Sequence, residues 1–357
     1  MKYHHNWENA KKRFSDLWEG KPTRIPYIGI MAPVKTRPVK ELTPPANDED
    51  FWLDPDWIIA KLEDSMKNTH WLGEIVPGIL LMSCWLISLG GKPEFDRNTI
   101  WFEQRTEIDF SKPSPFRHDK NDPWFLKFKH LFETVVKAAS EKGFCIGPQK
   151  GLPANDLLSM HMGTDNFLIA MMEHPEWVKD AIVRGAEDQL SVFIEFLRFA
   201  EKYLGDLCYC GTGWMPFWAP VPFMRTQSDV SCMLSPQMFE TFILPELEIY
   251  GKSFPLWYHL DGGNAKQHLP VLLSLPYLKV LQYVPMPSEP RNGIEHIEFY
   301  QQVQKAGKIV HIEVGAENIK EEFIKELDPS KILIDTRCGS LDEAEALLDK
   351  IAKWSGR

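Results

Sequence analysis

The stretch FPLWYHLDGGNAKQHLPVLLSLPYLKVLQYVP, residues 254–285, joins two short apolar runs through a segment with helical spacing. Residues 254–262 and 278–285 are rich in aromatic and β-branched side chains, which is typical of strands, and residues 265–275 are typical of a helix. Two consecutive strands joined by a helix run parallel in one sheet, because the helix carries the chain back to the starting edge. The stretch therefore predicts a strand–helix–strand unit.

The same alternation continues through the C-terminal half of the chain. Ser235 and Pro236 mark a helix start, Gly307 marks a helix end, and Ser340 with Glu343 forms a capping box. The predicted strands lie at residues 205–212, 254–262, 278–285, 308–314 and 331–338, and the helices that follow them lie at 235–253, 265–275, 297–307, 318–327 and 340–354. Five strand–helix units in succession predict an α/β fold, and the length favours a (βα)8 TIM barrel. No G-x-G-x-x-G motif follows a strand, which disfavours a dinucleotide-binding sheet.

The N-terminal half is less regular and predicts an elaboration of the barrel. A helix over residues 7–20 leads into a first strand at 24–31, and proline-rich residues 35–125 predict an extended or hairpin insertion. A long helix over 122–143, a strand over 144–149 and two helices within 164–205 follow. Because no segment has the composition of a domain linker, we expect residues 1–357 to form a single barrel domain with an N-terminal helical and extended elaboration.

Composition excludes several classes of function. The chain has 357 residues, with 50 acidic against 40 basic side chains and a formal charge of −10, which argues against a nucleic-acid partner. The most apolar window, PGILLMSCWLISLGG at 77–91, is shorter than the roughly 20 residues that span a bilayer, so no membrane partner is expected. Six cysteines are too few for a disulfide scaffold in a chain of this length, and the polar N-terminus is no secretion signal, so a cytoplasmic location is predicted.

Polar residues cluster at the predicted strand ends, where a barrel gathers its active site. They are Cys208, Cys210, His259, Asp261, Gln282, His311, Glu313, Asp335 and Cys338. Because side chains two apart on a strand share a face, His259 and Asp261 point the same way, although the sequence does not decide which face is inward. A histidine, a carboxylate and a cysteine that converge at one opening are candidate Zn²⁺ ligands with a position left for substrate. Each of them can equally be an ordinary strand-end residue.

Other residues have two interpretations as well. The pair Cys208 and Cys210 is a weak metal motif without a second pair, and buried cysteine is common. Asp229 is either a site carboxylate or a helix cap. The 13 Trp and 21 Phe residues fill a large core or line a cavity for a flat ligand.

The chain resembles the uroporphyrinogen decarboxylase superfamily of (βα)8 barrels. The resemblance rests on QSDVSCMLSPQMFETFILPELEIY (227–250), YHLDGGNAKQHLPVLLSLPYLKVLQYVP (258–285) and ILIDTRCGSLDEAEALL (332–348). Fainter matches are RIPYIGIM (24–31), LGGKPEFDRNTIWFE (89–103) and HMGTDNFLIAMMEHPEWV (161–178). The resemblance spans nearly the whole chain and implies one of two chemistries.

One chemistry is decarboxylation of a porphyrinogen. The true decarboxylases grip the substrate's carboxylates with an arginine-containing MRQAGR loop after the first strand, and here IGIMAPVKTRPVKEL (28–42) lacks it, with Lys35 and Arg37 as loose substitutes. In this alternative, Asp229 or Glu74 stabilises a protonated ring, and Arg225 or Arg37 binds a carboxylate.

The other chemistry is that of the corrinoid- and coenzyme M-dependent methyltransferases, whose zinc pattern is His-x-Cys with a distant Cys. Here His259-Leu-Asp261 and Cys338 occupy these positions, and Glu313 is a further candidate ligand. An aspartate in place of cysteine makes the zinc more Lewis acidic, which suits removal of a methyl group from an ether oxygen.

The leading hypothesis from the resemblance is a zinc-dependent methyltransferase that moves a methyl group between a small methylated substrate, such as an aryl methyl ether, and the corrinoid of a partner protein. The expected catalytic residues are Asp229, Arg225 and Glu74, and the expected substrate-binding residues are Trp214, Trp218, Tyr209 and Gln282, with Trp257 as a further aromatic residue near the mouth. A decarboxylase and a non-catalytic ligand-binding member of the superfamily are the alternatives.

Overall fold

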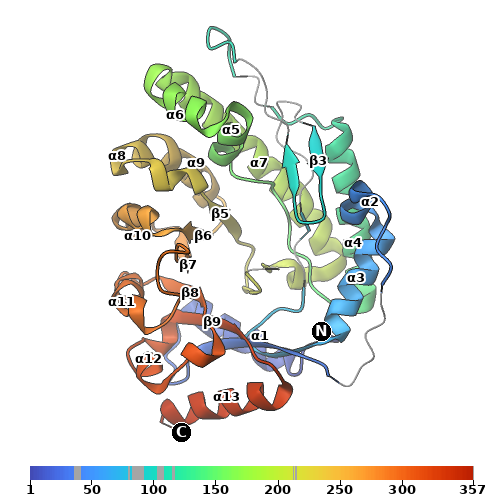
Figure 1. Ribbon diagram of the computed structural model, residues 1–357, viewed down its shortest axis with the longest axis vertical. Helices are drawn as coiled ribbons and strands as arrows, with labels where there is room; N and C mark the ends of the chain where they lie inside the picture. Colours follow the sequence, from blue (N-terminus) through green and yellow to red (C-terminus); the bar gives the residue numbers. More distant parts are fainter. Residues whose placement is uncertain are drawn as a thin grey trace.

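A curved α/β sheet forms the centre of the molecule, with helices on its outside (Figure 1). The structure is a computed structural model that describes residues 1–35, 42–78, 81–82, 92–102, 108–114, 117–211, 213 and 215–356. Arg37 and Trp214 lie outside the described residues.

The sheet has the strand order β2-β1-β9-β8-β7-β6-β5. All neighbouring strands are parallel except β1 and β2, which are antiparallel. The strands are β1 (Tyr27–Pro33), β2 (Thr69–Gly73), β5 (Met224–Gln227), β6 (Leu256–Asp261), β7 (Leu278–Val284), β8 (Ile309–Glu313) and β9 (Ile332–Arg337). The predicted α/β class and the parallel strands at the C-terminal half are therefore confirmed.

A complete eight-stranded barrel is not established. Within the described ranges the sheet has seven strands, and no ladder joins its two edges, β2 and β5. Single backbone hydrogen bonds connect the segments near this opening. The Val76 amide donates to the Pro216 carbonyl at 3.1 Å, and the Cys145 amide donates to the Pro77 carbonyl at 3.1 Å.

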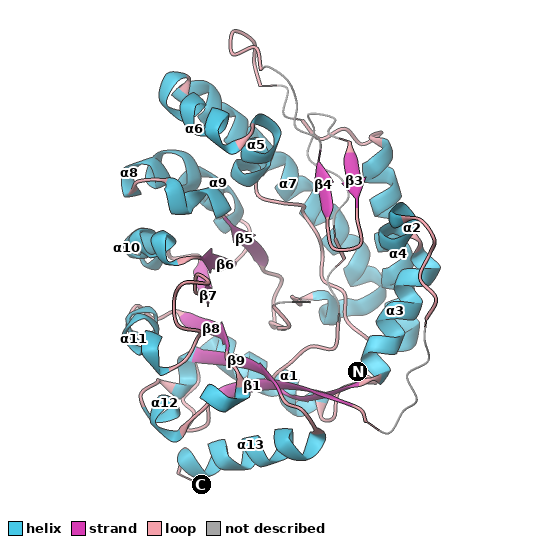
Figure 2. Ribbon diagram, viewed as in Figure 1, coloured by secondary structure: helices cyan, strands magenta, loops and turns pink. Residues whose placement is uncertain are grey.

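The helices are distributed along the whole chain (Figure 2). A separate hairpin of β3 (Pro93–Phe95) and β4 (Ile100–Phe102) confirms the predicted hairpin in the insertion. The N-terminal α-helices are α1 (Trp7–Glu19), α2 (Asp48–Leu53), α3 (Pro55–Lys67), α4 (Pro123–Lys142), α5 (Ala154–Met162), α6 (Thr164–Glu173) and α7 (Pro175–Leu204). The C-terminal α-helices are α8 (Pro236–Met238), α9 (Leu244–Gly251), α10 (Leu269–Ser274), α11 (Ile297–Lys305), α12 (Glu321–Lys325) and α13 (Leu341–Trp354).

Side-chain alternation divides the sheet into two faces with different neighbours. Residues such as Tyr258, Leu260 and Ile312 belong to the large core that the sheet shares with the outer helices. The alternate residues Trp257, Val280 and Leu333 belong to a second core on the inner face, together with α1. The periodicity of two therefore places His259 and Asp261 on the inner face, two and four residues beyond Trp257.

An aromatic cluster closes the inner face at the amino ends of the strands. Trp257 contacts Phe217 with ring centroids 4.0 Å apart, and Phe217 contacts Phe14 and Trp18 of α1 at 5.1 and 6.2 Å. These rings exclude water from the amino end of the inner face. Its polar residues therefore lie at the carboxyl end.

Two predicted strands are wrong. Residues 205–212 contain a 3-10 turn, Gly205–Cys208, because Gly205 ends α7 with a positive φ of 56° and the chain folds back on itself there. Among residues 205–211, Cys210 alone forms a β-bridge, with Trp218. The first C-terminal strand is instead β5, and residues 144–149 run without a ladder.

The helix predicted over residues 235–253 is interrupted. It consists of α8, a π-helical turn at Phe239–Ile243, and α9, whose first turn holds Pro245. Proline has no amide hydrogen to donate to the preceding turn, so the chain widens there into the i→i+5 pattern.

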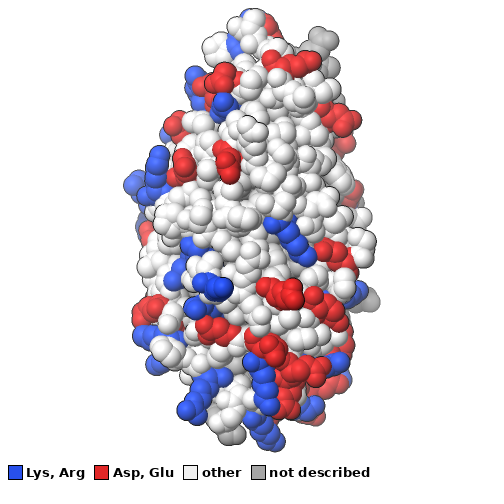
Figure 3. All heavy atoms as spheres, turned by 90° about the vertical axis from the view of Figure 1, so that its left-hand side faces the viewer, with Lys and Arg blue, Asp and Glu red and all other residues white. Residues whose placement is uncertain are grey.

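Basic and acidic side chains are mixed on one face of the molecule. The face at the left of Figure 1, shown in Figure 3, carries Lys and Arg side chains interspersed with Asp and Glu. Within the described ranges, the longest apolar helical stretches fall short of what a membrane crossing requires.

Glu74 is not at the carboxyl end of the strands, where a catalytic role requires it. It follows β2, which runs antiparallel to β1, so it lies beside the start of β1 at the amino end. Its carboxylate accepts hydrogen bonds from the Nε of Arg13 at 2.5 Å and from the Ile28 amide at 2.8 Å. The structure therefore gives Glu74 a structural role, joining α1 to the sheet.

Replacing Arg13 with methionine should leave the Glu74 carboxylate buried and unpaired. We expect the free energy of unfolding to fall by about 3–5 kcal/mol, measured by urea denaturation. Lys12→Met, which removes an exposed ion pair with Asp16 on the same helix, is the control and should cost less than about 1 kcal/mol. Equal effects of the two substitutions would contradict a structural role for the buried pair.

Candidate functional site

Four buried or half-buried polar side chains lie side by side on the inner face, at the carboxyl ends of the strands. His259 on β6 and Gln282 on β7 are hydrogen-bonded at 2.8 Å, and His311 on β8 and Asp335 on β9 at 2.6 Å. They occupy the layer directly above the aromatic cluster, and the ring of His311 contacts that of Trp257 at 5.0 Å. Parallel strands thus bring residues more than 70 positions apart into one polar layer.

The hydrogen bond to Gln282 fixes the state of His259. The amide Oε1 accepts only, so the Nδ1 of His259 carries the proton and donates it, and the lone pair of the neutral ring lies on Nε2. Burial lowers the pKa of His259, although the hydrogen bond and the charges of Asp261 and Asp229 oppose this shift. The imidazole is therefore neutral at physiological pH.

Two carboxyl groups next to this histidine form a coupled acidic pair. Asp229 follows β5, and its backbone amide donates to the Oδ1 of Asp156 on α5 at 2.8 Å. Burial, followed by the charge of Asp229, raises the pKa of Asp156 well above its usual range, and burial also raises the pKa of Asp229. The pair therefore retains a proton at a pH at which isolated carboxyl groups are ionised.

The start of α5 is held by a buried glutamate on α9. The carboxylate of Glu246 accepts from the amides of Ala154 and Asn155 at 2.8 and 3.2 Å and from the Asn155 side chain at 2.8 Å. The Tyr250 hydroxyl donates to the same carboxylate at 2.7 Å. A negative charge at a helix N-terminus is favourable, and this network fixes the position of Asp156.

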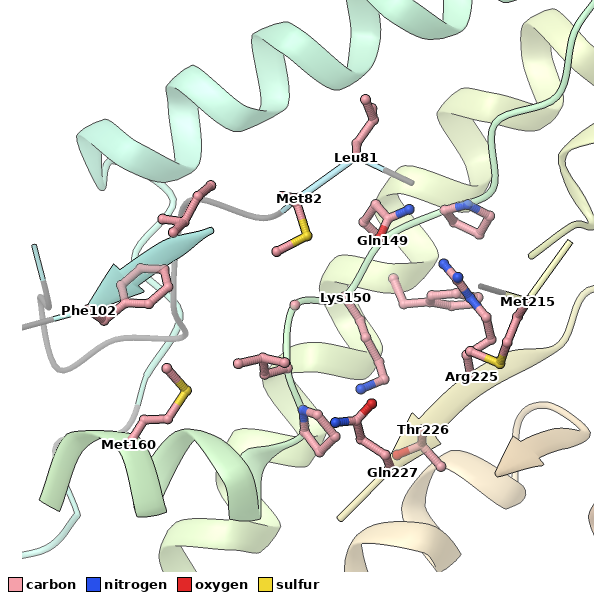
Figure 4. Close-up of a pocket in the computed structure, with 16 residues that line it drawn as sticks. Leu81, Met82, Phe102, Gln149, Lys150, Met160, Met215, Arg225, Thr226 and Gln227 are labelled. Atoms are coloured by element: carbon pink, nitrogen blue, oxygen red, sulfur yellow. The ribbon is translucent and has the colours of Figure 1, made fainter. Parts of the chain in front are cut away.

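A cavity of about 170 Å³ adjoins the acidic pair (Figure 4). Gln227 of β5 connects the two, because it lines the cavity and its Nε2 donates to the Oδ1 of Asp229 at 2.8 Å. The wall is largely apolar, and its polar members converge on one side. The lining residues that Figure 4 labels are Leu81, Met82, Phe102, Gln149, Lys150, Met160, Met215, Arg225, Thr226 and Gln227.

The four predicted zinc ligands are not assembled into a metal site. Across the part of the chain that the structure describes, no three His, Cys, Asp or Glu side chains are grouped so that they could hold a metal ion. Cys338 follows β9, whereas His259 is on β6, and two strands, β7 and β8, lie between them. The charged group that acts on the Cys338 thiol is Glu343. The carboxylates of Asp261 and Glu313 are exposed at the rim.

The predicted aromatic substrate contacts lie elsewhere. Trp218 is buried at the amino end, where its Nε1 donates to the Asp206 carbonyl at 2.7 Å, and Trp257 is buried in the inner core. The Tyr209 hydroxyl donates to Glu201 of α7 at 2.7 Å. The structure uses these rings for packing, and Trp214 remains outside the described residues.

Of the other predicted residues, Gln282, Arg225 and Asp229 lie at the inner face or the cavity. Sequence reasoning missed Lys150, Gln149, Asp156 and Gln227. A signal was present, because Lys150 and Asp156 are the only Asp, Glu, Lys or Arg residues between positions 143 and 164. A lone charged residue in an apolar stretch is costly unless it has a partner or a function.

Comparison with known proteins shows that the fold is shared with a protein of known structure. No protein-family model matches the chain, and no curated protein matches its sequence. The structure is similar to that of a methyltransferase from Methanosarcina mazei, with a TM-score of 0.60 and 12% sequence identity, over 97% of this chain and 98% of the other. The two proteins share a fold over their whole lengths.

The raised pKa of Asp156 predicts that removal of its charge stabilises the folded protein more at high pH than at low pH. Because the pKa of Asp156 is raised on folding, ionisation destabilises the folded state as pH rises above the unfolded value of about 3.8. In Asp156→Asn the side-chain oxygen still accepts from the backbone, but the charge is gone. We expect a gain of about 1–3 kcal/mol at pH 8 and a smaller one at pH 5 in urea denaturation.

Asp122→Asn is the matched control. Asp122 also accepts two backbone amide bonds, from Trp124 and Phe125, but at a surface helix cap. Its replacement should change stability by less than about 1 kcal/mol at both pH values. A loss of stability in Asp156→Asn at pH 8 would show that Asp156 acts as an ionised cap.

Proposed function

We propose that the protein is a methyltransferase that transfers a methyl group from a small substrate bound in the cavity to an acceptor at the carboxyl end of the sheet. The observation that carries the proposal is the acidic pair beside a neutral histidine, which Gln227 connects to a largely apolar cavity. The fold shared with a methyltransferase supports it.

The chemical step needs an acid at the donor. The bond between the methyl carbon and its heteroatom breaks, the electron pair stays on the heteroatom, and that atom takes a proton from Asp229. The methyl carbon forms its new bond with an electron pair of the acceptor. Asp229 suits this role because its raised pKa keeps it protonated closer to neutral pH.

The acceptor in this proposal is the reduced corrinoid of a separate protein, which approaches the open carboxyl end. The resemblance of the sequence to corrinoid-dependent methyltransferases supports this choice. Zinc stays a prediction from the same resemblance, and the step above does not use it, because the described residues do not assemble its ligands. One zinc per chain that is lost in His259→Ala would support the metal prediction, and metal-free active protein would overturn it.

Methyl transfer can be tested with free cobalamin, reduced in the assay, as the acceptor. Methyl ethers, methylamines and methyl thioethers are offered as donors, and methylcobalamin is followed by its absorbance. For the active donor we expect Asp229→Asn to lower kcat about 100-fold or more. The rate of the parent protein should fall as pH rises through the pKa of the acidic pair, because the acid form is then lost.

Asp206→Asn is the control, since this carboxylate pairs with Lys11 at the amino end and should not affect the rate. An Asp229→Asn variant with the parent rate would contradict the acid role.

The two cavity cations, Lys150 and Arg225, favour decarboxylation of a carboxylated substrate as a second candidate. Release of CO2 without methylcobalamin would select that candidate.

A further inference from the structure

The cavity contains two cationic side chains and no acidic one. Of the described residues that line it, Lys150 and Arg225 carry positive charge, and none is an aspartate or glutamate. Figure 4 shows both side chains, with Gln149 and Gln227, around the same space. A cavity with this lining has a positive potential in low-dielectric surroundings.

Among the described residues, no acidic side chain forms an ion pair with Lys150. Its side chain is only 7% exposed, and it makes neither a hydrogen bond nor an ion pair with any described residue. Its ammonium lies 5.2 Å from the centre of the Tyr250 ring. A buried ammonium without an anion is costly, so a missing partner is the natural explanation for its presence.

The nearest acidic groups do not supply that partner. Glu246 and Asp156 both act on Lys150 electrostatically, but neither forms an ion pair or a hydrogen bond with it. The carboxylate of Glu246 receives the hydrogen bonds at the start of α5 and that of Tyr250, and the Oδ1 of Asp156 receives two backbone amides. The cation is therefore left facing the cavity.

The loop that carries Lys150 is rigid. Pro148 and Pro153 restrict its two ends, and Gly151 adopts a φ of 79° that favours glycine. The side-chain amide of Gln189 donates to the Leu152 carbonyl. The backbone of Lys150 is thus restrained before a ligand binds, which reduces the ordering cost of binding.

Arg225 supplies a second cation from β5. It is on β5, in register with Trp257, so its side chain lies on the inner face. Within the described part of the chain, it too makes no ion pair or hydrogen bond. Lys150 and Arg225 therefore approach one cavity from a loop and a strand that are 75 positions apart in the sequence.

We propose that this cavity binds a small organic carboxylate, with its charged group paired to Lys150 and Arg225 and its apolar body packed against Leu81, Met82, Phe102 and Met160. This inference rests on the proposed function in one respect, that the bound carboxylate is the methyl donor. The binding site itself is inferred from the residues that line the cavity. One or two anionic groups match the two cations. The apolar wall selects against small inorganic anions.

Isothermal titration of the full chain with benzoate, phenylacetate and their neutral amides tests the proposal without any acceptor. The amides match the acids in shape, so the comparison isolates the charge. We expect at least one carboxylate to bind at least tenfold more tightly than its amide at pH 7. Lys150→Met should weaken that carboxylate at least tenfold and leave the amide unchanged.

Two further variants make the test specific. Lys150→Arg keeps the charge and should stay within about threefold of the parent affinity. Lys279→Met is the matched control, because Lys279 is also half-buried against a ring, Trp18, but lies outside the cavity lining. It should leave binding unchanged, and urea denaturation should show that every variant is folded.

The pH dependence gives an independent readout. Burial lowers the pKa of Lys150 to about 8, with Arg225 adding to the shift and Glu246 and Asp156 opposing it. Carboxylate affinity should therefore fall as pH rises above about 8 in the parent protein and stay level in Lys150→Arg.

Several outcomes would overturn the proposal. Equal binding of every acid and its amide would show that the cavity does not recognise the charge. Full affinity in Lys150→Met would remove Lys150 from the site, and equal loss in Lys150→Arg and Lys150→Met would show that the amine itself is required. Carboxylate binding without methyl transfer would leave this site intact and refute only the proposed function.

Discussion

The two-residue period of the parallel strands is the constraint on which the site depends. It separates the apolar residues that pack against the outer helices from those that face inward, such as Trp257. Two residues further along, the same face carries His259, Gln282, His311 and Asp335. A one-residue shift of register would place these polar groups in the helix-facing core, which burial energetics forbids.

The polar layer is stable because the layer below it is dry and tightly packed. The rings of α1, Phe217 and Trp257 occupy the amino end, so the His311–Asp335 pair is supported from beneath by aromatic contacts. The Arg13–Glu74 pair then ties α1 to the start of β1. Stability is concentrated at one end of the strands, while the other end carries charged groups that are unfavourable for folding, as expected of a functional site.

The elements that local patterns define were predictable from sequence. The strands β6 to β9 and their helices carry caps and apolar runs that act within a few residues, and these predictions are confirmed. The strand predicted at 205–212 failed because Gly205 and the end of α7 override the β-propensity of Leu207 to Cys210. Closure of a full barrel depends on long-range pairing, which no local pattern determines.

The site was predictable only where its residues belong to strands. His259 and Gln282 lie in recognisable strands, whereas Asp229 follows β5, a strand that the sequence did not predict. Resemblance alone suggested the zinc set, which the described residues do not assemble. Lys150 and Asp156 lie in a loop and a helix, and only the fold brings them to β5. The sequence feature that could have indicated them is that they are the two charged residues in an otherwise apolar and polar-uncharged stretch.

Positive and negative side chains lie on different sides of the site, so they orient a charged ligand. Lys150 and Arg225 face the cavity on one side of Gln227, and Asp229 and Asp261 lie beyond it toward the rim. An anionic group is attracted to the first side and repelled from the second, so a bound carboxylate has a single favourable orientation. Its apolar end then packs against Leu81, Met82, Phe102 and Met160 (Figure 4). Gln227 lines the cavity beside Lys150 (Figure 4) and donates a hydrogen bond to Asp229, so it is the residue that connects the anion site to the acid of the proposed transfer.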